Sequence, residues 1–176
     1  MRSHPTHSPA HTTSDTAQTT HNLEQALHLH QVELEHQNDE LRRTQSDLAA
    51  ARDRYLDLYD FAPVGYLTLD TDGRILEVNR TGATLLGMAP QVLKGNGLGR
   101  FVMAGDSDRW QQYLQHVLAT DGLQRVDLGL AAEDGHQWYG QIDSLRTPLA
   151  DGTHALRVTL TDITERLRAD MERRIA

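Results

Sequence analysis

Apolar and polar residues alternate along five short segments between residues 61 and 163, and this alternation predicts β-strands. The segments are 65–70, 75–79, 125–131, 137–145 and 154–162. Three Asp-Gly dipeptides, beginning at Asp72, Asp134 and Asp151, lie between segments of this kind. Because Asp and Gly both tolerate positive φ, each dipeptide predicts a tight hairpin. We therefore expect a sheet of five antiparallel strands.

The pattern changes to a helical period between the second and third of these strands. Thr81–Gly87 predicts a short helix that Gly87 ends, and a longer helix is expected from Asp106 or Ser107 through Thr120. The longer helix carries an apolar stripe that includes Trp110 and Leu114. Residues 90–101 contain three glycines and are expected to form a loop. The fold class predicted is α+β, with helices on one face of the sheet.

A long helix is predicted ahead of this domain, over residues 22–60. The stretch lacks Pro and Gly and is rich in good helix formers. Large side chains recur every seven residues, which is typical of a dimerising coiled coil. The recurring residues are Leu27, Leu34, Leu41, Leu48 and Tyr55. Residues 1–21 are mostly Ser, Thr, Pro and His, so we expect them to be disordered.

Two heptad registers of this helix remain open. If the recurring residues are a positions, the d positions are Leu23, His30, Gln37, Thr44, Ala51 and Leu58. If they are d positions, the a positions include Gln31, Asn38, Gln45 and Arg52. In either register the seam, the row of a and d positions that faces the partner helix, is partly polar. Two registers of similar energy form the two-state element that a signalling switch requires.

Composition excludes several classes of protein. The formal charge of −8 and the pI of about 5.6 disfavour nucleic-acid binding. The chain has no cysteine, which excludes disulfides and thiol nucleophiles. No apolar run is long enough to cross a bilayer, and the amino end does not resemble a signal peptide, so a cytoplasmic location is expected. Phosphate-loop, His-Glu-x-x-His and nucleophile-elbow motifs are missing from the sequence, and no catalytic activity is expected.

Two stretches of sequence resemble a known family. Residues 62–88, "APVGYLTLDTDGRILEVNRTGATLLGM", look like the amino-terminal half of a bacterial PAS domain. Residues 159–174, "TLTDITERLRADMERR", resemble the junction at which the last PAS strand enters an output helix, as in sensor histidine kinases. The resemblance implies a PAS fold over 61–163, preceded by the signalling and dimerisation helix 22–60 and followed by an exit helix over 164–176.

The resemblance also implies which residues transmit and receive a signal. PAS domains commonly hold a ligand between the sheet and the helices. At the junction we expect Asp162 and Thr164 to relay the signal, with Arg74 or Arg157 as partners of the acid. The residues expected to line the pocket are Trp110, Tyr113, Leu114, Val126, Leu128, Trp138, Leu156 and Val158.

The identity of a cofactor does not follow from the sequence. Family members that carry a covalent flavin adduct or a hydroxycinnamate chromophore need a cysteine, so both are excluded. Haem needs an axial ligand, and the one histidine of the predicted long helix, His116, is expected to point away from the interior.

The resulting prediction is a non-catalytic sensory module that forms a homodimer and relays ligand or partner binding through its flanking helices. Its expected partners are a second copy of itself and a sensor kinase or other signalling protein in a two-component pathway, without nucleic acid or membrane. Two alternatives remain open: a ligand-free dimerisation adaptor and the N-terminal sensor fragment of a larger histidine kinase.

Overall fold

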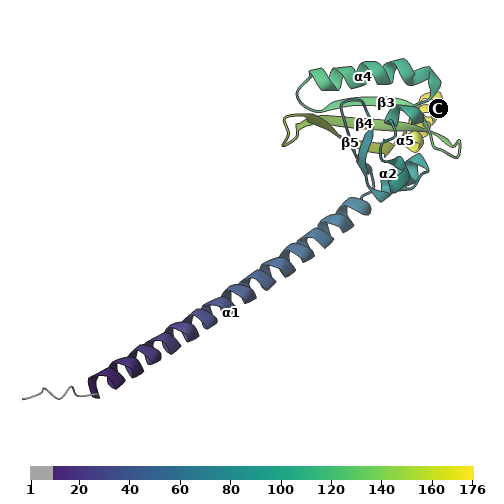
Figure 1. Ribbon diagram of the computed structural model, residues 1–176. Helices are drawn as coiled ribbons and strands as arrows, with labels where there is room; N and C mark the ends of the chain where they lie inside the picture. The colour runs from purple at the N-terminus through teal and green to yellow at the C-terminus, as the bar shows by residue number, and fades with distance from the viewer. Residues whose placement is uncertain (1–9) are drawn as a thin grey trace, which may run out of the picture. The chain divides into compact units, whose positions relative to one another are not determined.

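The computed structural model describes residues 10–176, with side chains from residue 13 onward. The chain divides into two compact units, one ending at Arg54 and one spanning Tyr55–Ala176. Figure 1 labels the main elements along the chain. The helices are α1 Ala10–Asp60, α2 Arg80–Leu86, α3 Pro90–Leu93, α4 Ser107–Ala119 and α5 Thr164–Ile175, with 3₁₀ turns at Leu98–Phe101 and Ala104–Asp106. The strands are β1 Gly65–Leu69, β2 Ile75–Val78, β3 Gln124–Ala131, β4 Gln137–Pro148 and β5 His154–Asp162.

The predicted sheet of five antiparallel strands is confirmed within the described residues, in the order β2-β1-β5-β4-β3. The first and last strands of the domain are central neighbours, since Leu67 of β1 lies opposite Val158 of β5. Three hairpins complete the sheet, with Leu67 also opposite Val78, Leu130 opposite Trp138, and Ile142 opposite Leu160. The α+β class and the PAS-like element order are therefore confirmed.

All three predicted Asp-Gly turns form. Gly73, Gly135 and Gly152 have φ of 80°, 88° and 83°, a region that glycine enters without steric cost. The side chain of Asp151 also accepts hydrogen bonds from the Thr153 backbone N–H and hydroxyl at 3.0 and 2.6 Å. These bonds lower the pKa of Asp151. Local chemistry therefore fixes the register of the hairpins.

One face of the sheet carries the hydrophobic core, and α2, α3 and α4 supply the other side of it. Leu69, Leu156 and Leu160 from the sheet are at most 1 % exposed and belong to the same cluster as Leu86 and Val117 from the helices. Figure 1 shows α4 lying along the sheet. This arrangement leaves the opposite sheet face available for other contacts.

The segment 90–101, expected to be a loop, contains two short helical turns. Pro90 begins α3 at the first helical position, where its missing N–H costs no hydrogen bond. Leu93, Leu98 and Phe101 are almost fully buried, so core packing holds this glycine-rich stretch in place.

The long helix is present but begins earlier than predicted. Residues 10–21, expected to be disordered, form the start of α1. Neither Pro nor Gly occurs from Ala10 to Asp60, and extending an existing helix costs far less than nucleating a new one. The remainder of the predicted tail, residues 1–9, lies outside the described residues. No helix that the structure describes has the length and apolar character needed to span a membrane.

Candidate functional site

A buried asparagine joins the last turn of α1 to the sheet. Asn79 follows β2, is 0 % exposed, and caps α2 by accepting a hydrogen bond from the Gly82 N–H at 2.9 Å. The same Oδ1 accepts from the Tyr66 N–H at 2.9 Å. Its Nδ2 donates to the Tyr59 carbonyl at 2.6 Å and to the Val64 carbonyl at 3.1 Å. All four hydrogen-bonding positions of the amide are therefore used. We call Asn79 and the four backbone groups that it binds the Asn79 hub.

Two glycines let the backbones approach closely enough for this hub to form. A Cβ added to Gly65 would lie 2.9 Å from the Gly82 Cα, and one added to Gly82 would lie 3.2 Å from Asn79 Oδ1. Real Cβ atoms do not tolerate the first distance. The crossing of β1 and α2 thus requires glycine at position 65, and a side chain at position 82 would have to displace its neighbours.

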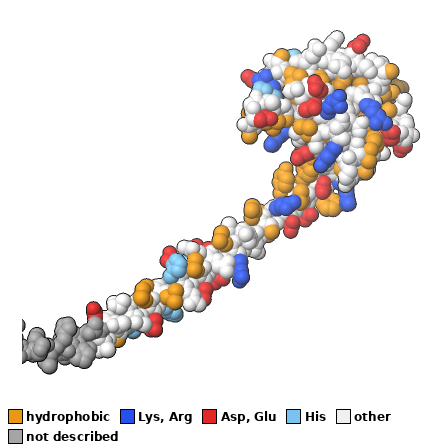
Figure 2. Space-filling view, viewed as in Figure 1, with side chains coloured by type: hydrophobic (Ala, Val, Ile, Leu, Met, Phe, Trp, Pro, Cys, Tyr) orange, Lys and Arg blue, Asp and Glu red, His pale blue; other side chains and the backbone are white. Residues whose placement is uncertain are grey.

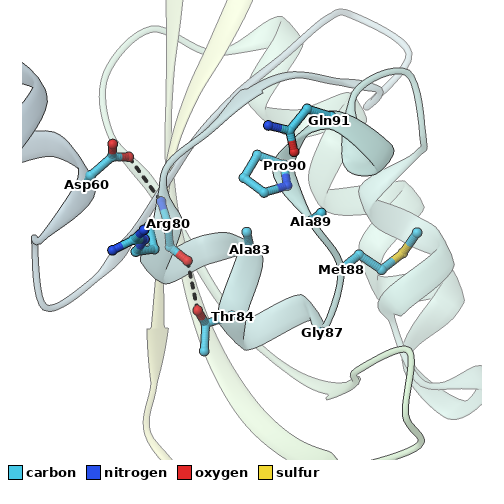
Figure 3. A pocket seen from close by; sticks show the side chains of 9 residues that line it. All are labelled: Asp60, Arg80, Ala83, Thr84, Gly87, Met88, Ala89, Pro90 and Gln91. Carbon is cyan, nitrogen blue, oxygen red and sulfur yellow. Dashed lines mark hydrogen bonds between the residues drawn. The ribbon is translucent and has the colours of Figure 1, made fainter.

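The end of α1 makes a second attachment beside a surface cleft. Figure 3 shows Asp60 accepting from the Arg80 N–H, a bond of 3.2 Å, and the Thr84 hydroxyl donating to the Arg80 carbonyl at 3.0 Å. The Arg80 guanidinium also lies 5.5 Å from the Phe61 ring centroid. The cleft has a volume of about 510 Å³ and continues along α2 to Gln91.

The exit helix α5 is joined to the sheet by a relay of hydrogen bonds. The Tyr139 N–H of β4 donates to the Thr164 hydroxyl at 3.0 Å, and that hydroxyl donates to the Asp162 carboxylate at 2.6 Å. The Thr164 N–H also donates to this carboxylate at 2.9 Å. The structure thus brings the two predicted relay residues together, and we call this group the α5 latch.

Details of the α5 latch differ from the sequence-based expectation. An acid that ends a strand just before a helix is a natural candidate for its N-cap, but that position belongs to Ile163, and Asp162 acts one residue earlier through an Asx-type turn. Neither predicted basic partner pairs with the acid in the described part of the chain: Arg74 lies 3.4 Å from the Gly95 carbonyl, and Arg157 lines a groove on the sheet. Uncharged donors satisfy the carboxylate instead.

The residues expected to line a ligand pocket come together in the core. Seven of the eight are buried, and Val126 is partly buried against them. They contact one another and the surrounding leucines, which fills the inward positions with side chains. The buried residues are Trp110, Tyr113, Leu114, Leu128, Trp138, Leu156 and Val158.

Two polar groups lie among these aromatic side chains. The Tyr113 hydroxyl donates to the Gln124 carbonyl at 2.9 Å, and burial raises its pKa to about 12, so it remains a donor. The Trp138 indole N–H is buried, and no acceptor reaches it among the residues that the structure describes. A buried donor without a partner costs about 1–3 kcal/mol. This N–H is thus a point at which an acceptor from a ligand would gain affinity.

The opposite face of the sheet carries a groove of about 550 Å³, which we call the outer groove. Three tyrosines stack along its wall: the Tyr59 ring lies 6.0 Å from Tyr55 and 5.9 Å from Tyr66. Burial, followed by the nearby Glu77 carboxylate, raises the pKa of Tyr59 to about 12. Leu58, which is 76 % exposed, also lines the groove. The last turn of α1 and the sheet therefore form one continuous surface.

The remaining sequence-predicted residues lie on the surface. The heptad residues Leu27, Leu34, Leu41, Leu48 and Tyr55 are between 51 % and 69 % exposed. Figure 2 shows hydrophobic side chains spaced along α1. His116 is also exposed, with its Nε2 3.0 Å from Gln124 Oε1. The described residues contain no group of three or more side chains arranged to hold a metal ion.

The place of Asn79 directly after a strand is typical of a helix cap, but its link to α1 has no signal in the sequence. Capping follows from the position of the residue after a strand. The bonds to Tyr59 and Val64 span 20 and 15 residues, and no local pattern carries that information. The outer groove was missed for the same reason, because it joins α1, β1 and β5.

Comparison with known proteins agrees with the fold. The chain is similar to the PAS domain of an HTR-like protein from Haloarcula marismortui, with 24 % identity, a TM-score of 0.61, and coverage of 69 % of this chain and 99 % of that one. It is also similar to a PAS domain from Colwellia psychrerythraea, with 17 % identity, a TM-score of 0.57, and coverage of 65 % of this chain and 98 % of that one. A third similar structure is a domain of a sensory box sensor histidine kinase/response regulator from Geobacter sulfurreducens, with 19 % identity, a TM-score of 0.53, and coverage of 65 % of this chain and 96 % of that one. Among curated proteins none matches this sequence.

A sequence model described as "PAS fold" matches residues 59–168, which is more than half of the 176 residues. Domains of this family serve as sensor and signalling modules. The element order, the antiparallel sheet and this match agree, and the chain belongs to the PAS fold family.

Proposed function

We propose that this chain is a non-catalytic signalling module that forms a homodimer through α1 and relays binding events between α1 and α5. The observation that carries the proposal is that both flanking helices are hydrogen-bonded to the same sheet by dedicated polar side chains. Asn79 holds the Tyr59 carbonyl of α1, and Thr164 holds the Tyr139 N–H of β4. A helix that served only as a spacer would need neither.

The two attachments lie at opposite ends of a continuous set of strand pairs. Asn79 binds the backbone of Tyr66 in β1, β1 pairs with β5, and β5 pairs with β4, which carries the α5 latch. A small twist or shift of the sheet would therefore change the geometry of both helices. Packed elements with two alternative arrangements convert such small shifts into discrete changes.

The proposed partners are a second copy of the chain and a sensor kinase or other signalling protein. The exposed heptad residues of α1 support the first partner, because apolar side chains at seven-residue spacing gain free energy when two helices pair. The similarity to a domain from a sensor histidine kinase/response regulator supports the second. The chain would act in the cytoplasm, as a free protein or as the sensor segment of a larger histidine kinase.

Hydrogen–deuterium exchange of the full chain tests the relay. Thr164→Val removes the hydroxyl of the α5 latch and keeps the shape of the side chain. If the sheet couples the two helices, exchange rises in α5 and also in residues 55–60 at the other attachment. Thr161→Val is the matched control, because Thr161 lies three residues earlier, in β5, and its hydroxyl makes no hydrogen bond within the described part of the chain. An increase confined to α5 would contradict the relay.

A ligand-free dimerisation adaptor is the second candidate function, and the filled interior favours it. The inward positions hold closely packed Trp, Tyr and Leu side chains. The unpartnered Trp138 N–H favours a ligand instead. The chain has only two tryptophans, so two indole N–H signals report on the interior by NMR, and Trp110→Phe assigns them. Native mass spectrometry with added mass, together with a downfield Trp138 signal, would support a ligand; a bare dimer would support the adaptor.

A further inference from the structure

We propose that α1 pairs in parallel with α1 of a second copy in one of the two heptad registers, the one with Leu27, Leu34, Leu41, Leu48 and Tyr55 at a. This inference rests on the proposed dimer and assigns its interface. The sequence leaves both registers open. Contacts at the carboxyl end of the helix distinguish them.

Tyr59 is the residue that separates the registers. In the alternative register it takes the next a position after Arg52 and has to face the partner helix. Its ring instead stacks on Tyr66 of its own sheet, and its carbonyl accepts the bond from Asn79. Turning the Tyr59 side of α1 toward a partner helix would break these contacts with the sheet and with Asn79. The alternative register therefore conflicts with the folded domain.

Leu58 takes the corresponding place in the proposed register. It is a d position there and is 76 % exposed, and the a position Tyr55 is 63 % exposed. The Tyr55 ring stacks on Tyr59 of its own chain, but most of its surface, like that of Leu58, stays open to a partner while Tyr59 packs on its own domain. The proposed seam also holds apolar residues at three of its six d positions, Leu23, Ala51 and Leu58, whereas Gln31, Asn38, Gln45 and Arg52 are all polar.

Charge placement supports the parallel sense. In the proposed register Asp47 is at g and Arg52 is at e of the next heptad, the two positions that face each other between parallel helices. Neither forms an ion pair within the described part of its own chain. Asp47 of one chain can thus pair with Arg52 of the other. The two-fold symmetry of a parallel dimer gives two such pairs.

The proposed seam ends at the outer groove. Tyr55 and Leu58 line that groove as well as the seam, together with Arg157 of β5. Pairing of the helices therefore places the partner's last turn beside the sheet. A change in the sheet then acts directly on the end of the seam.

Disulfide crosslinking of single-cysteine variants tests the register, because the natural chain contains no cysteine. Thr44→Cys and Ala51→Cys place a thiol at d of the proposed register. Gln45→Cys and Arg52→Cys place one at a of the alternative. Ser46→Cys lies outside both seams and is a near-isosteric control. We expect the first two variants to form disulfide dimers at least about ten-fold faster than the other three, since a disulfide requires Cβ atoms about 4 Å apart.

Each other result overturns the proposal in a recognisable way. Faster crosslinking of Gln45→Cys and Arg52→Cys assigns the alternative register. Equal rates at all four seam positions mean a sliding seam. A dimer by light scattering without crosslinks at either pair means that the helices are not parallel, and a monomer refutes the proposed dimer itself.

A charge exchange provides an independent test of the parallel sense. Asp47→Arg places like charges together and should raise the dimer dissociation constant roughly five- to ten-fold at low salt. Combining it with Arg52→Asp should restore the natural value. An unchanged dissociation constant in the single variant would contradict the parallel pairing.

Discussion

Replacing Asn79 by alanine tests the hub that holds α1 on the domain. The substitution removes the acceptor for the Tyr66 and Gly82 N–H groups and the donor to the Tyr59 and Val64 carbonyls. The side chain is completely buried, so water does not readily replace it. The cap of α2 and the Asn79 bonds to the α1 end of the chain are lost together, while the Asp60–Arg80 bond remains.

The expected magnitude follows from the number of bonds. A typical intramolecular hydrogen bond contributes about 1 kcal/mol net, and an orphaned buried partner costs somewhat more. Four such bonds give a loss of at least about 4 kcal/mol in the free energy of unfolding. For a domain of about 100 residues this lowers Tm by at least about 10 °C.

Urea unfolding followed by circular dichroism measures this loss, with Asn96→Ala as the control. Asn96 donates one surface bond, to the Val92 carbonyl at 2.6 Å, so its removal should cost less than about 1 kcal/mol. Asn79→Asp refines the result: it keeps the acceptor oxygen but presents a second oxygen to the Tyr59 and Val64 carbonyls. We expect Asn79→Asp to increase hydrogen–deuterium exchange most at residues 55–60. If the free energies of unfolding of Asn79→Ala and of the control differ by less than about 1 kcal/mol, the Asn79 hub does not stabilise the domain.

Two further substitutions probe the surroundings of the site. Gly82→Ala should destabilise the domain by about 1–3 kcal/mol because its Cβ would come within 2.9 Å of a valine methyl of β2; Gly105→Ala, with open space around it, should be close to neutral in the same melting experiment. The Gly129 N–H and then Arg109 lower the pKa of Asp106 in the folded state, so its contribution is present above the unfolded pKa of about 4 and is lost as pH falls through the lower folded value. The Tm deficit of Asp106→Asn should thus be largest near pH 7 and should shrink below about pH 4, and a deficit that stays constant with pH would refute this assignment.

The elements of the domain were predictable because their signals are local. The Asp-Gly dipeptides and the alternation in 125–131 and 154–162 depend on neighbouring residues alone, and the strands lie within one or two residues of prediction, except that β4 continues to Pro148. The pairing of β1 with β5 joins residues about 90 positions apart, which no local pattern encodes. Only the family resemblance indicated that topology.

The candidate site was predictable in part. The residues expected around a pocket do face the interior, since strand alternation fixes which side chains point inward. How tightly they pack depends on volumes contributed by several elements, including the 90–101 segment that was expected to be a loop. Likewise, Thr164 was identified from the junction motif, whereas its bond to Tyr139 depends on where α5 meets β4.

The hub at Asn79 is built from a side-chain amide and backbone groups, and none of its members carries a formal charge. Ionic screening acts on full charges and has little effect on buried neutral dipoles. The proposed Asp47–Arg52 pairs of the helical seam are charged and solvent-facing. Higher ionic strength would therefore weaken the proposed association of two chains while leaving the last turn of α1 bonded to its own domain, so the proposed dimerisation and the proposed transmission within a subunit would respond to salt separately.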